Sequence, residues 1–419
     1  MITGQRLRDL TLIVLKLVDV GARAGFVLTA TYGLRIDHAG QFGLIVTLVG
    51  LFAFAFNFER HIDIQRRTAG EPLPVFDRAV SAALGFFAFN WVLMAPLFVI
   101  AVAALAHVGW VLLALATVIV IAEHPSNLAY HYALISTRYR ALLVVVTLKN
   151  IALAGVVLYA ALFARERFDL AFILWAWAIG GVVCTTVLAA LWLRVRTPLE
   201  RSEPFRFSVD ILGQHKASAT HFGLGLLAIL TLQFDRLAVG ALLSLDQVGL
   251  YFRHTLLVSL AYQAFNIVSF NRVMPQVYAA SRVRDLSHMA RTMRREYAKT
   301  LVGTPLLLLI AVLADRLTAG AYTERFNLSL TLMAVMLVGF MLRAAADFHA
   351  LVLNARHREA DVLRRQSVAF GLGAVALGLL TWRYGVYGAA AAGVFTAGLY
   401  LMLVSRCLHR AQREEMPAA

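Results

Sequence analysis

The sequence predicts an all-α polytopic membrane protein, with about twelve transmembrane helices in two six-helix bundles. Of its 419 residues, 60% are hydrophobic and only 15% are charged, whereas soluble domains are about 45–50% apolar and about 25% charged. Apolar runs of about 20 residues recur along the chain, and each is long enough to cross a hydrocarbon core of about 30 Å. This composition argues against the alternative of a soluble helical bundle with a large core, and the continuously apolar runs exclude a β-barrel.

Breaks that are basic or rich in turn residues separate the apolar runs and define the elements in order. We expect spans at residues 10–33, 41–59, 79–105, 108–136, 141–163, 170–193, 219–243, 247–271, 300–317, 328–354, 363–382 and 386–406. Between two of them, the segment 285–300 places Leu286, Met289, Met293 and Tyr297 at helical intervals, with arginines largely on the other side. It predicts an amphipathic helix on the cytoplasmic face, and a solvated connector is the alternative.

Basic residues mark one side of the membrane. One set of breaks contains roughly 27 arginines and lysines and the opposite set only six, a strong positive-inside bias. The six are Arg35, Arg165, Arg167, Arg316, Arg325 and Arg383. Both termini are therefore expected in the cytoplasm. This bias accounts for most of the net charge of +15, so we expect no nucleic-acid partner.

Enzymatic and metal motifs are not apparent in the sequence. Two cysteines, Cys184 and Cys407, suggest neither a disulfide framework nor a metal site. Glu123-His124-Pro125 is not a zinc motif, because no second ligand follows at i+4. There is no GxxxxGK phosphate-binding loop, and no cleavable signal peptide is evident. We expect no catalytic residue, no metal and no cofactor.

A short internal repeat supports the two-bundle organisation. The stretch 36–49, IDHAGQFGLIVTLV, resembles 245–258, LDQVGLYFRHTLLV. Each copy joins the first and second spans of a six-helix half, so we expect halves at 1–200 and 201–419. An even number of spans per half relates the two by a pseudo-twofold axis along the membrane normal, a plan that places a central site between halves. Chance similarity of one short loop is the alternative.

Two stretches also resemble a known family. FDRLAVGALLSLDQVGLY, with Asp235, Gly240 and Val248-Gly249-Leu250-Tyr251, is similar to the start of the second half of polysaccharide flippases. HAGQFGL, followed by the basic 64–67 (IQRR), resembles the matching region of their first half. These are Wzx-type proteins of the multidrug/oligosaccharidyl-lipid/polysaccharide exporter (MOP) superfamily. The resemblance is specific only over these stretches, and the chain is compact beside typical members.

The resemblance implies a function. Such flippases move polyprenyl-diphosphate-linked oligosaccharides across the bacterial inner membrane for surface polysaccharides such as O-antigen or exopolysaccharide. Membrane lipids and polysaccharide polymerase machinery are then the expected partners. A cation-coupled multidrug exporter of the same superfamily is the main alternative. A membrane polymerase or ligase is disfavoured by the short outer loops, and a lipid scramblase without sugar specificity stays open.

Charged residues inside the predicted spans are the candidate site, because each costs about 2.5–3.5 kcal/mol at the bilayer centre unless it faces a partner or a wet cavity. The cations are Lys16, Arg23, Lys149, Arg236, Arg253 and Arg343. The acids are Asp19, Glu123, Asp235 and Asp347. The surplus of cations suits a diphosphate, which arginine binds through paired donors. Structural ion pairs and snorkelling side chains are the alternative.

The spacing of these charges predicts some partnerships. Lys16, Asp19 and Arg23 share one helical face, and Arg343 and Asp347 lie at i, i+4. The neighbours Asp235 and Arg236 diverge by about 100°, so we expect them to reach different helices, with Asp235 holding a cation on the first or eighth span. Glu123 lies beside the kink expected at Pro125. An acid there either couples transport to a proton or sodium gradient or forms hydrogen bonds with polar groups near the kink.

Overall fold

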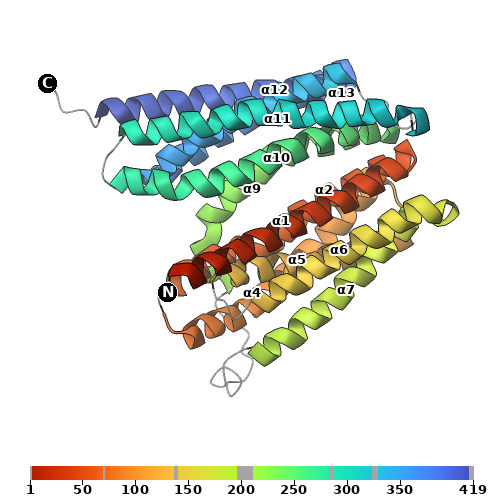
Figure 1. Ribbon diagram of the computed structural model, residues 1–419, viewed down its shortest axis with the longest axis horizontal. Helices are drawn as coiled ribbons and strands as arrows, with labels where there is room; N and C mark the ends of the chain where they lie inside the picture. Colours follow the sequence, from red (N-terminus) through yellow and green to blue (C-terminus); the bar gives the residue numbers. More distant parts are fainter. Residues whose placement is uncertain are drawn as a thin grey trace. The chain divides into compact units, whose positions relative to one another are not determined.

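The computed structural model describes residues 2–68, 71–135, 140–195, 211–282, 286–322 and 329–414. The regular secondary structure of these residues is helical throughout (Figure 1). The chain forms two compact units, residues 1–230 and 231–419. The boundary between them falls inside a helix, and the halves 1–200 and 201–419 stay a prediction.

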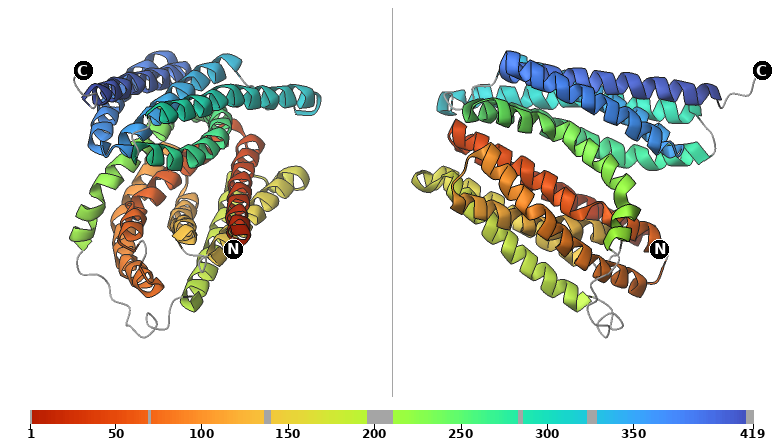
Figure 2. Two further views of the ribbon diagram at one scale, coloured as in Figure 1. Left: turned by 60° about the vertical axis from the view of Figure 1, so that its left-hand side comes forward. Right: turned by 180° about the vertical axis from the view of Figure 1, so that it is seen from behind.

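The first unit contains most of the N-terminal helices. They are α1 (Ile2–Gly33), α2 (Ile36–Asn57), α3 (Arg60–Thr68), α4 (Leu73–Ala106), α5 (Trp110–Ile135), α6 (Arg140–Phe163), the 3-10 turn η2 (Arg165–Arg167), α7 (Leu170–Val195) and the beginning of α9 (Ile211–Leu242). Helix α5 is central, since it packs against α2, α4, α6 and α7, while α1 packs along α6 (Figure 2). This position brings residues of α5 within reach of several neighbouring helices.

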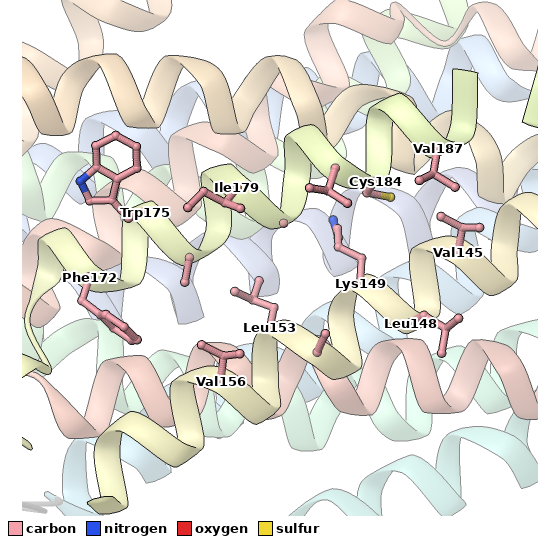
Figure 3. A pocket seen from close by; sticks show the side chains of 14 residues that line it. Val145, Leu148, Lys149, Leu153, Val156, Phe172, Trp175, Ile179, Cys184 and Val187 are labelled. Atoms are coloured by element: carbon pink, nitrogen blue, oxygen red, sulfur yellow. The ribbon is translucent and has the colours of Figure 1, made fainter. Parts of the chain in front are cut away.

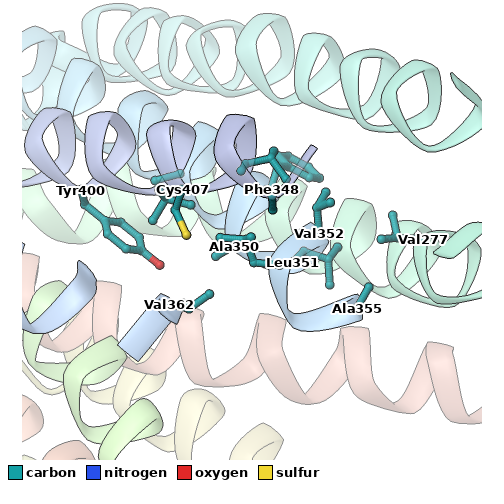
Figure 4. Packing of buried hydrophobic residues seen from close by; sticks show 14 of the residues in the cluster. Val277, Phe348, Ala350, Leu351, Val352, Ala355, Val362, Tyr400 and Cys407 are labelled. Atoms are coloured by element: carbon teal, nitrogen blue, oxygen red, sulfur yellow. The ribbon is translucent and has the colours of Figure 1, made fainter. Parts of the chain in front are cut away.

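The second unit contains the end of α9 and four long helices. These are α10 (Leu245–Arg282), α11 (Leu286–Tyr322), α12 (Leu330–Ala355) and α13 (Glu359–Glu414). Helix α13 is interrupted at Gly385, whose φ of 59° and ψ of −140° are not helical. Buried residues of α10, α12 and α13 form one apolar core that includes Val277, Phe348 and Tyr400 (Figure 4). The contact between α12 and α13 is the most extensive in this unit, while α11 packs mainly against α10.

The predicted spans agree with the observed helices. With the two parts of α13 counted separately, the described residues contain twelve long helices, and each predicted span falls on one of them. Eight helices of the described residues are long and apolar enough to cross a membrane, with α13 counted once. The protein is thus an all-helical, multi-pass membrane protein built from two helical units.

The predicted amphipathic segment 285–300 differs from the structure. Residues from Leu286 onward begin α11, which continues without a break into the predicted span. Met293 and Tyr297 pack against the apolar core of the second unit, and the Tyr297 hydroxyl donates to the Met341 carbonyl at 3.3 Å. Two residues of the apolar face that suggested a helix on the membrane surface, Met293 and Tyr297, therefore pack on protein instead.

Candidate functional site

Glu123 of α5 is the centre of a polar cluster in the first unit. Lys149 Nζ of α6 donates to Glu123 Oε1 at 2.7 Å, and Trp177 Nε1 of α7 donates to the same oxygen at 2.7 Å. Arg23 Nη2 of α1 donates to Oε2 at 3.3 Å. Four helices therefore meet on one carboxylate, and two cations share it.

These partners differ sharply in exposure. The side chains of Glu123 and Lys149 are only 3% and 4% exposed, whereas that of Arg23 is 47% exposed. A buried ion pair is costly to break, because removal of one partner leaves an uncompensated charge. Lys149 is thus fixed by Glu123, while Arg23 has one nitrogen anchored and about half of its side chain accessible.

The polar face of α1 is directed at α5 and α6. Lys16 Nζ lies 3.3 Å from the ring centroid of Tyr130, a cation–π contact. Asp19 is buried and accepts a 2.6 Å hydrogen bond from Asn150 Nδ2. Together with Arg23, these residues behave as one face of the helix, as their spacing predicts.

A groove lies between α6 and α7 beside this cluster (Figure 3). Its volume is about 660 Å³. The lining residues are apolar except for Lys149 and Cys184, and they are Val145, Leu148, Lys149, Ala152, Leu153, Val156, Phe172, Trp175, Ala176, Ile179, Gly180, Val183, Cys184 and Val187. The aliphatic part of Lys149 lines the groove while its ammonium reaches Glu123.

A second polar group lies between α12 and α13. Arg343 Nε is 2.9 Å from Asp347 Oδ1, and the Arg343 guanidinium carbon lies 4.9 Å from the ring centroid of Tyr400. Arg343 is only 6% exposed. Its Nη1 has no hydrogen-bond partner among the described residues. The i, i+4 pair predicted from the sequence is present, and Nη1 of Arg343 is a donor that this pair does not use.

Asp235 and Arg236 diverge as predicted, but both reach the same helix. Asp235 Oδ2 accepts a 2.6 Å hydrogen bond from the Tyr251 hydroxyl of α10, and Arg236 lies 5.5 Å from the ring centroid of Phe252, also on α10. The expectation of different helices is therefore wrong. The expected cation on Asp235 is replaced by a neutral hydroxyl, because the tyrosine lies close to this stretch of α9.

Arg253 is buried, only 8% exposed, on the same helix. Its neighbour His254 accepts a 2.7 Å hydrogen bond from the Ser329 backbone N–H, which precedes α12. The polar residues of α10 thus help to position the start of α12.

Several members of these clusters were not identified from the sequence. Trp177 donates to Glu123 and Asn150 donates to Asp19, two of the buried acids of the first unit, and Tyr400 covers Arg343. A tryptophan in an apolar run is not distinguishable, from the sequence, as a hydrogen-bond donor to a buried acid. Asn150 directly follows Lys149, so a polar pair in the middle of α6 was the one available indication.

A metal centre finds no support in the described part of the chain. There, no three or more histidine, cysteine, aspartate or glutamate side chains are grouped to hold a metal ion. His124 of the Glu-His-Pro stretch accepts a 3.1 Å hydrogen bond from Trp91 Nε1 and is surrounded by aromatic rings, including Phe87. It is part of the packing between α4 and α5.

Comparison with known proteins identifies similar folds. No protein-family model matches the chain, and no curated protein matches it. A solved structure described as the lipid II flippase MurJ, inward closed conformation, is similar at a TM-score of 0.69 and 10% identity, over 95% of this chain and 87% of that chain.

Two transporter structures are also similar. An inward-facing multidrug resistance MATE family transporter of the MOP superfamily has a TM-score of 0.66 and 13% identity, over 95% of this chain and 96% of that one. A point mutant of the Vibrio cholerae MATE transporter VcmN has a TM-score of 0.55 and 14% identity, over 97% of this chain and 96% of that one. At these identities the likeness concerns the fold, and the chain has the two-lobe helical fold found in flippase and multidrug transporter structures.

Proposed function

We propose that this protein is a flippase for a lipid-linked oligosaccharide, of the Wzx type, in the bacterial inner membrane. The observation that carries the proposal is Arg23, which is anchored on Glu123 and has about half of its side chain accessible. An arginine held by one nitrogen keeps other donors for a phosphate. The fold similarity to a lipid II flippase supports a substrate of this class.

In this proposal the cations have two roles. Arg23 binds the diphosphate directly. Additional positive potential comes from Arg253, Lys16 and the buried Arg343, which has an unused donor. Lys149 and Arg236 are positioning residues, since Lys149 is bound to Glu123 and Arg236 lies against the Phe252 ring. Transport then proceeds by alternating access around a cationic central cavity. Asp19, Asp235 and Asp347 fix the helices, and a proton or sodium gradient supplies the drive.

A cation-coupled multidrug exporter is the second candidate, favoured by the similarity to two MATE transporters. Such a protein needs an acid that is available to a cationic drug. Glu123 is occupied by two cations and an indole N–H, which favours the flippase. Asp235, which accepts from the Tyr251 hydroxyl and the Arg236 backbone N–H, is the acid that such an exporter would use.

The experiment is a leaflet-protection assay on purified protein in vesicles. A polyprenyl-diphosphate oligosaccharide is loaded, and an impermeant enzyme reports which leaflet exposes the sugar. We expect protein-dependent movement that Arg23→Ala abolishes and Arg23→Lys partly retains. A matched variant, Arg35→Ala, alters an arginine that is 79% exposed and paired with Asp37, and it should transport normally. Movement of a cationic dye without movement of the sugar would establish the exporter instead.

A further inference from the structure

The groove between α6 and α7 is suited to hydrocarbon rather than to water. Twelve of its fourteen lining residues are apolar or glycine, and one of the other two is Lys149, whose ammonium is already bound to Glu123. A water molecule needs several polar partners, and an empty groove forfeits dispersion contacts. An occupant made of methylene groups satisfies both conditions.

The residues that line the groove explain its shape. Ala152, Ala176 and Gly180 have small side chains, or none, between the helices. Larger residues such as Trp175 and Ile179 stand beside them, 50% and 57% exposed. These exposed apolar side chains lie inside the candidate spans Arg140–Phe163 and Leu170–Arg194. The groove therefore opens toward the lipid.

The length of the groove matches a chain from one leaflet. Its lining on α6, residues 145–156, covers roughly 17 Å, and on α7, residues 172–187, roughly 22 Å, at about 1.5 Å per residue. One leaflet contributes about 15 Å of the hydrocarbon core of about 30 Å. An ordinary acyl chain fits this length, whereas a long polyprenyl chain would extend beyond it.

One end of the groove lies toward a connection that carries two exposed arginines. Its Phe172 end lies near the α6–α7 connection, where η2 exposes Arg165 and Arg167. Two acids share this connection. Glu166 is exposed, and Asp169 accepts a 2.7 Å hydrogen bond from the Phe172 N–H, which caps α7. Arginine binds phosphate through paired, charge-assisted hydrogen bonds, so these two exposed cations suit a lipid phosphate.

We propose that this groove is a binding site for one acyl chain of a bilayer phospholipid, whose phosphate is bound by Arg165 and Arg167. The chain lies over the stem of Lys149 and keeps water from the Lys149–Glu123 pair. The site is separate from the substrate site proposed above and does not depend on the substrate that is transported.

The test uses the full-length protein in nanodiscs of phosphatidylethanolamine and phosphatidylglycerol. The probe is a phosphatidylglycerol with a photoreactive diazirine on one acyl chain, and peptide mass spectrometry locates the crosslinks. We expect labels concentrated on the groove residues of α6 and α7. Gly180→Leu and Ala152→Leu, which fill the groove, should each lose this labelling. Arg165→Ala combined with Arg167→Ala should weaken it.

Gly155→Leu is the matched control on α6. A side chain at Gly155 meets nothing within 4 Å, and at Gly180 the nearest atom is Lys149 Cγ at 3.9 Å, so both positions accept a Cβ. The control should label like the unmodified protein. Labels spread evenly over all lipid-facing helices, or undiminished in both groove-filling variants, would overturn the proposal. Displacement of the probe by a polyprenyl diphosphate would assign the groove to the substrate chain and overturn it as well.

Discussion

Glu123 shows how burial changes the meaning of a charged residue. Its carboxylate accepts from Lys149, Trp177 and Arg23, so three of its neighbours are positioned by one side chain. In a low-dielectric interior the contacts with the buried Lys149 and Trp177 are strong, and each is also costly to leave unmatched. The residue therefore organises the first unit whether or not it takes part in transport.

The Lys149–Glu123 pair leads to a stability prediction. Glu123→Gln should destabilise the protein by about 3–5 kcal/mol, because a buried ammonium loses its counter-charge. The double variant Glu123→Leu with Lys149→Met should recover most of this loss, since an apolar pair of similar volume removes both buried charges. Thermal unfolding in detergent measures the difference.

The transport activity of the same double variant separates two roles. If it is stable and still transports, the pair is purely structural. If it is stable and inactive, the charges act on the substrate or on the coupling ion. A single variant at Glu123 that unfolds no more readily than the unmodified protein would contradict the buried-pair interpretation.

The sequence predicted which charged residues belong to this cluster better than it predicted which of them contact one another. Arg23, Lys149 and Glu123 stand out because charges are rare in apolar runs. Their pairing depends on α1, α5 and α6 packing together, and nothing local in the sequence specifies that packing. Trp177 was not apparent at all, because tryptophan is common in apolar spans as a packing residue.

At the scale of the elements, α9 is attached to the first unit by an aromatic contact. Phe222 stacks on Phe58, with ring centroids 3.9 Å apart, and on Phe54 at 5.6 Å. Phe58 and Glu59 adopt positive φ values of 48° and 54° at the turn between α2 and α3. This turn, although strained, presents its aromatic side chain directly to α9.

Gly225 permits the close approach of α9 to this turn. A Cβ there would lie 2.6 Å from Phe54 Cζ and 2.9 Å from Glu59 Oε1. Gly225→Ala should therefore destabilise the protein by about 1–3 kcal/mol through overpacking. Gly223→Ala is the control, because its Cβ meets nothing within 4 Å, and it should be neutral or stabilising by up to about 1 kcal/mol. Equal melting temperatures for the two variants would contradict the close contact.

Gly385 supports a second prediction of this kind. Its φ of 59° with ψ of −140° is a conformation that essentially only glycine adopts. Gly385→Ala should cost about 1–3 kcal/mol and disturb the break between the two parts of α13. Gly393→Ala, in a helical position with no atom within 4 Å of the added Cβ, should not. Denaturation of both variants under the same conditions tests this.

Hydropathy predicted the long helices well, but it did not predict where some of them end. Each span was found because crossing a membrane requires a long apolar run. The N-terminal part of α11 was misread as a surface helix, since amphipathicity alone cannot tell a lipid surface from a protein surface. Helix α3 was not expected at all, because its nine residues are too few and too polar to produce an apolar run.

At the scale of the whole molecule, the distribution of basic residues leads to a topology prediction. Both termini should lie in the cytoplasm, and the α6–α7 connection outside. A cysteine introduced at Glu166, which is exposed, should react with a membrane-impermeant maleimide in intact cells. One introduced at Arg67, exposed at the end of α3, should react only after lysis. The reverse pattern would invert the proposed orientation.

The separation in sequence between Glu123 and Lys149 has a consequence for biogenesis. They lie 26 positions apart on the consecutive helices α5 and α6, so they enter the translocon as one hairpin. Arg23, by contrast, is synthesised 100 positions before its carboxylate partner. The hairpin can neutralise its own charges while it partitions into lipid, and α1 needs to dock only later. We therefore expect the α5–α6 pair to insert without the rest of the bundle, and α1 to reach its final position only after α5 has been made.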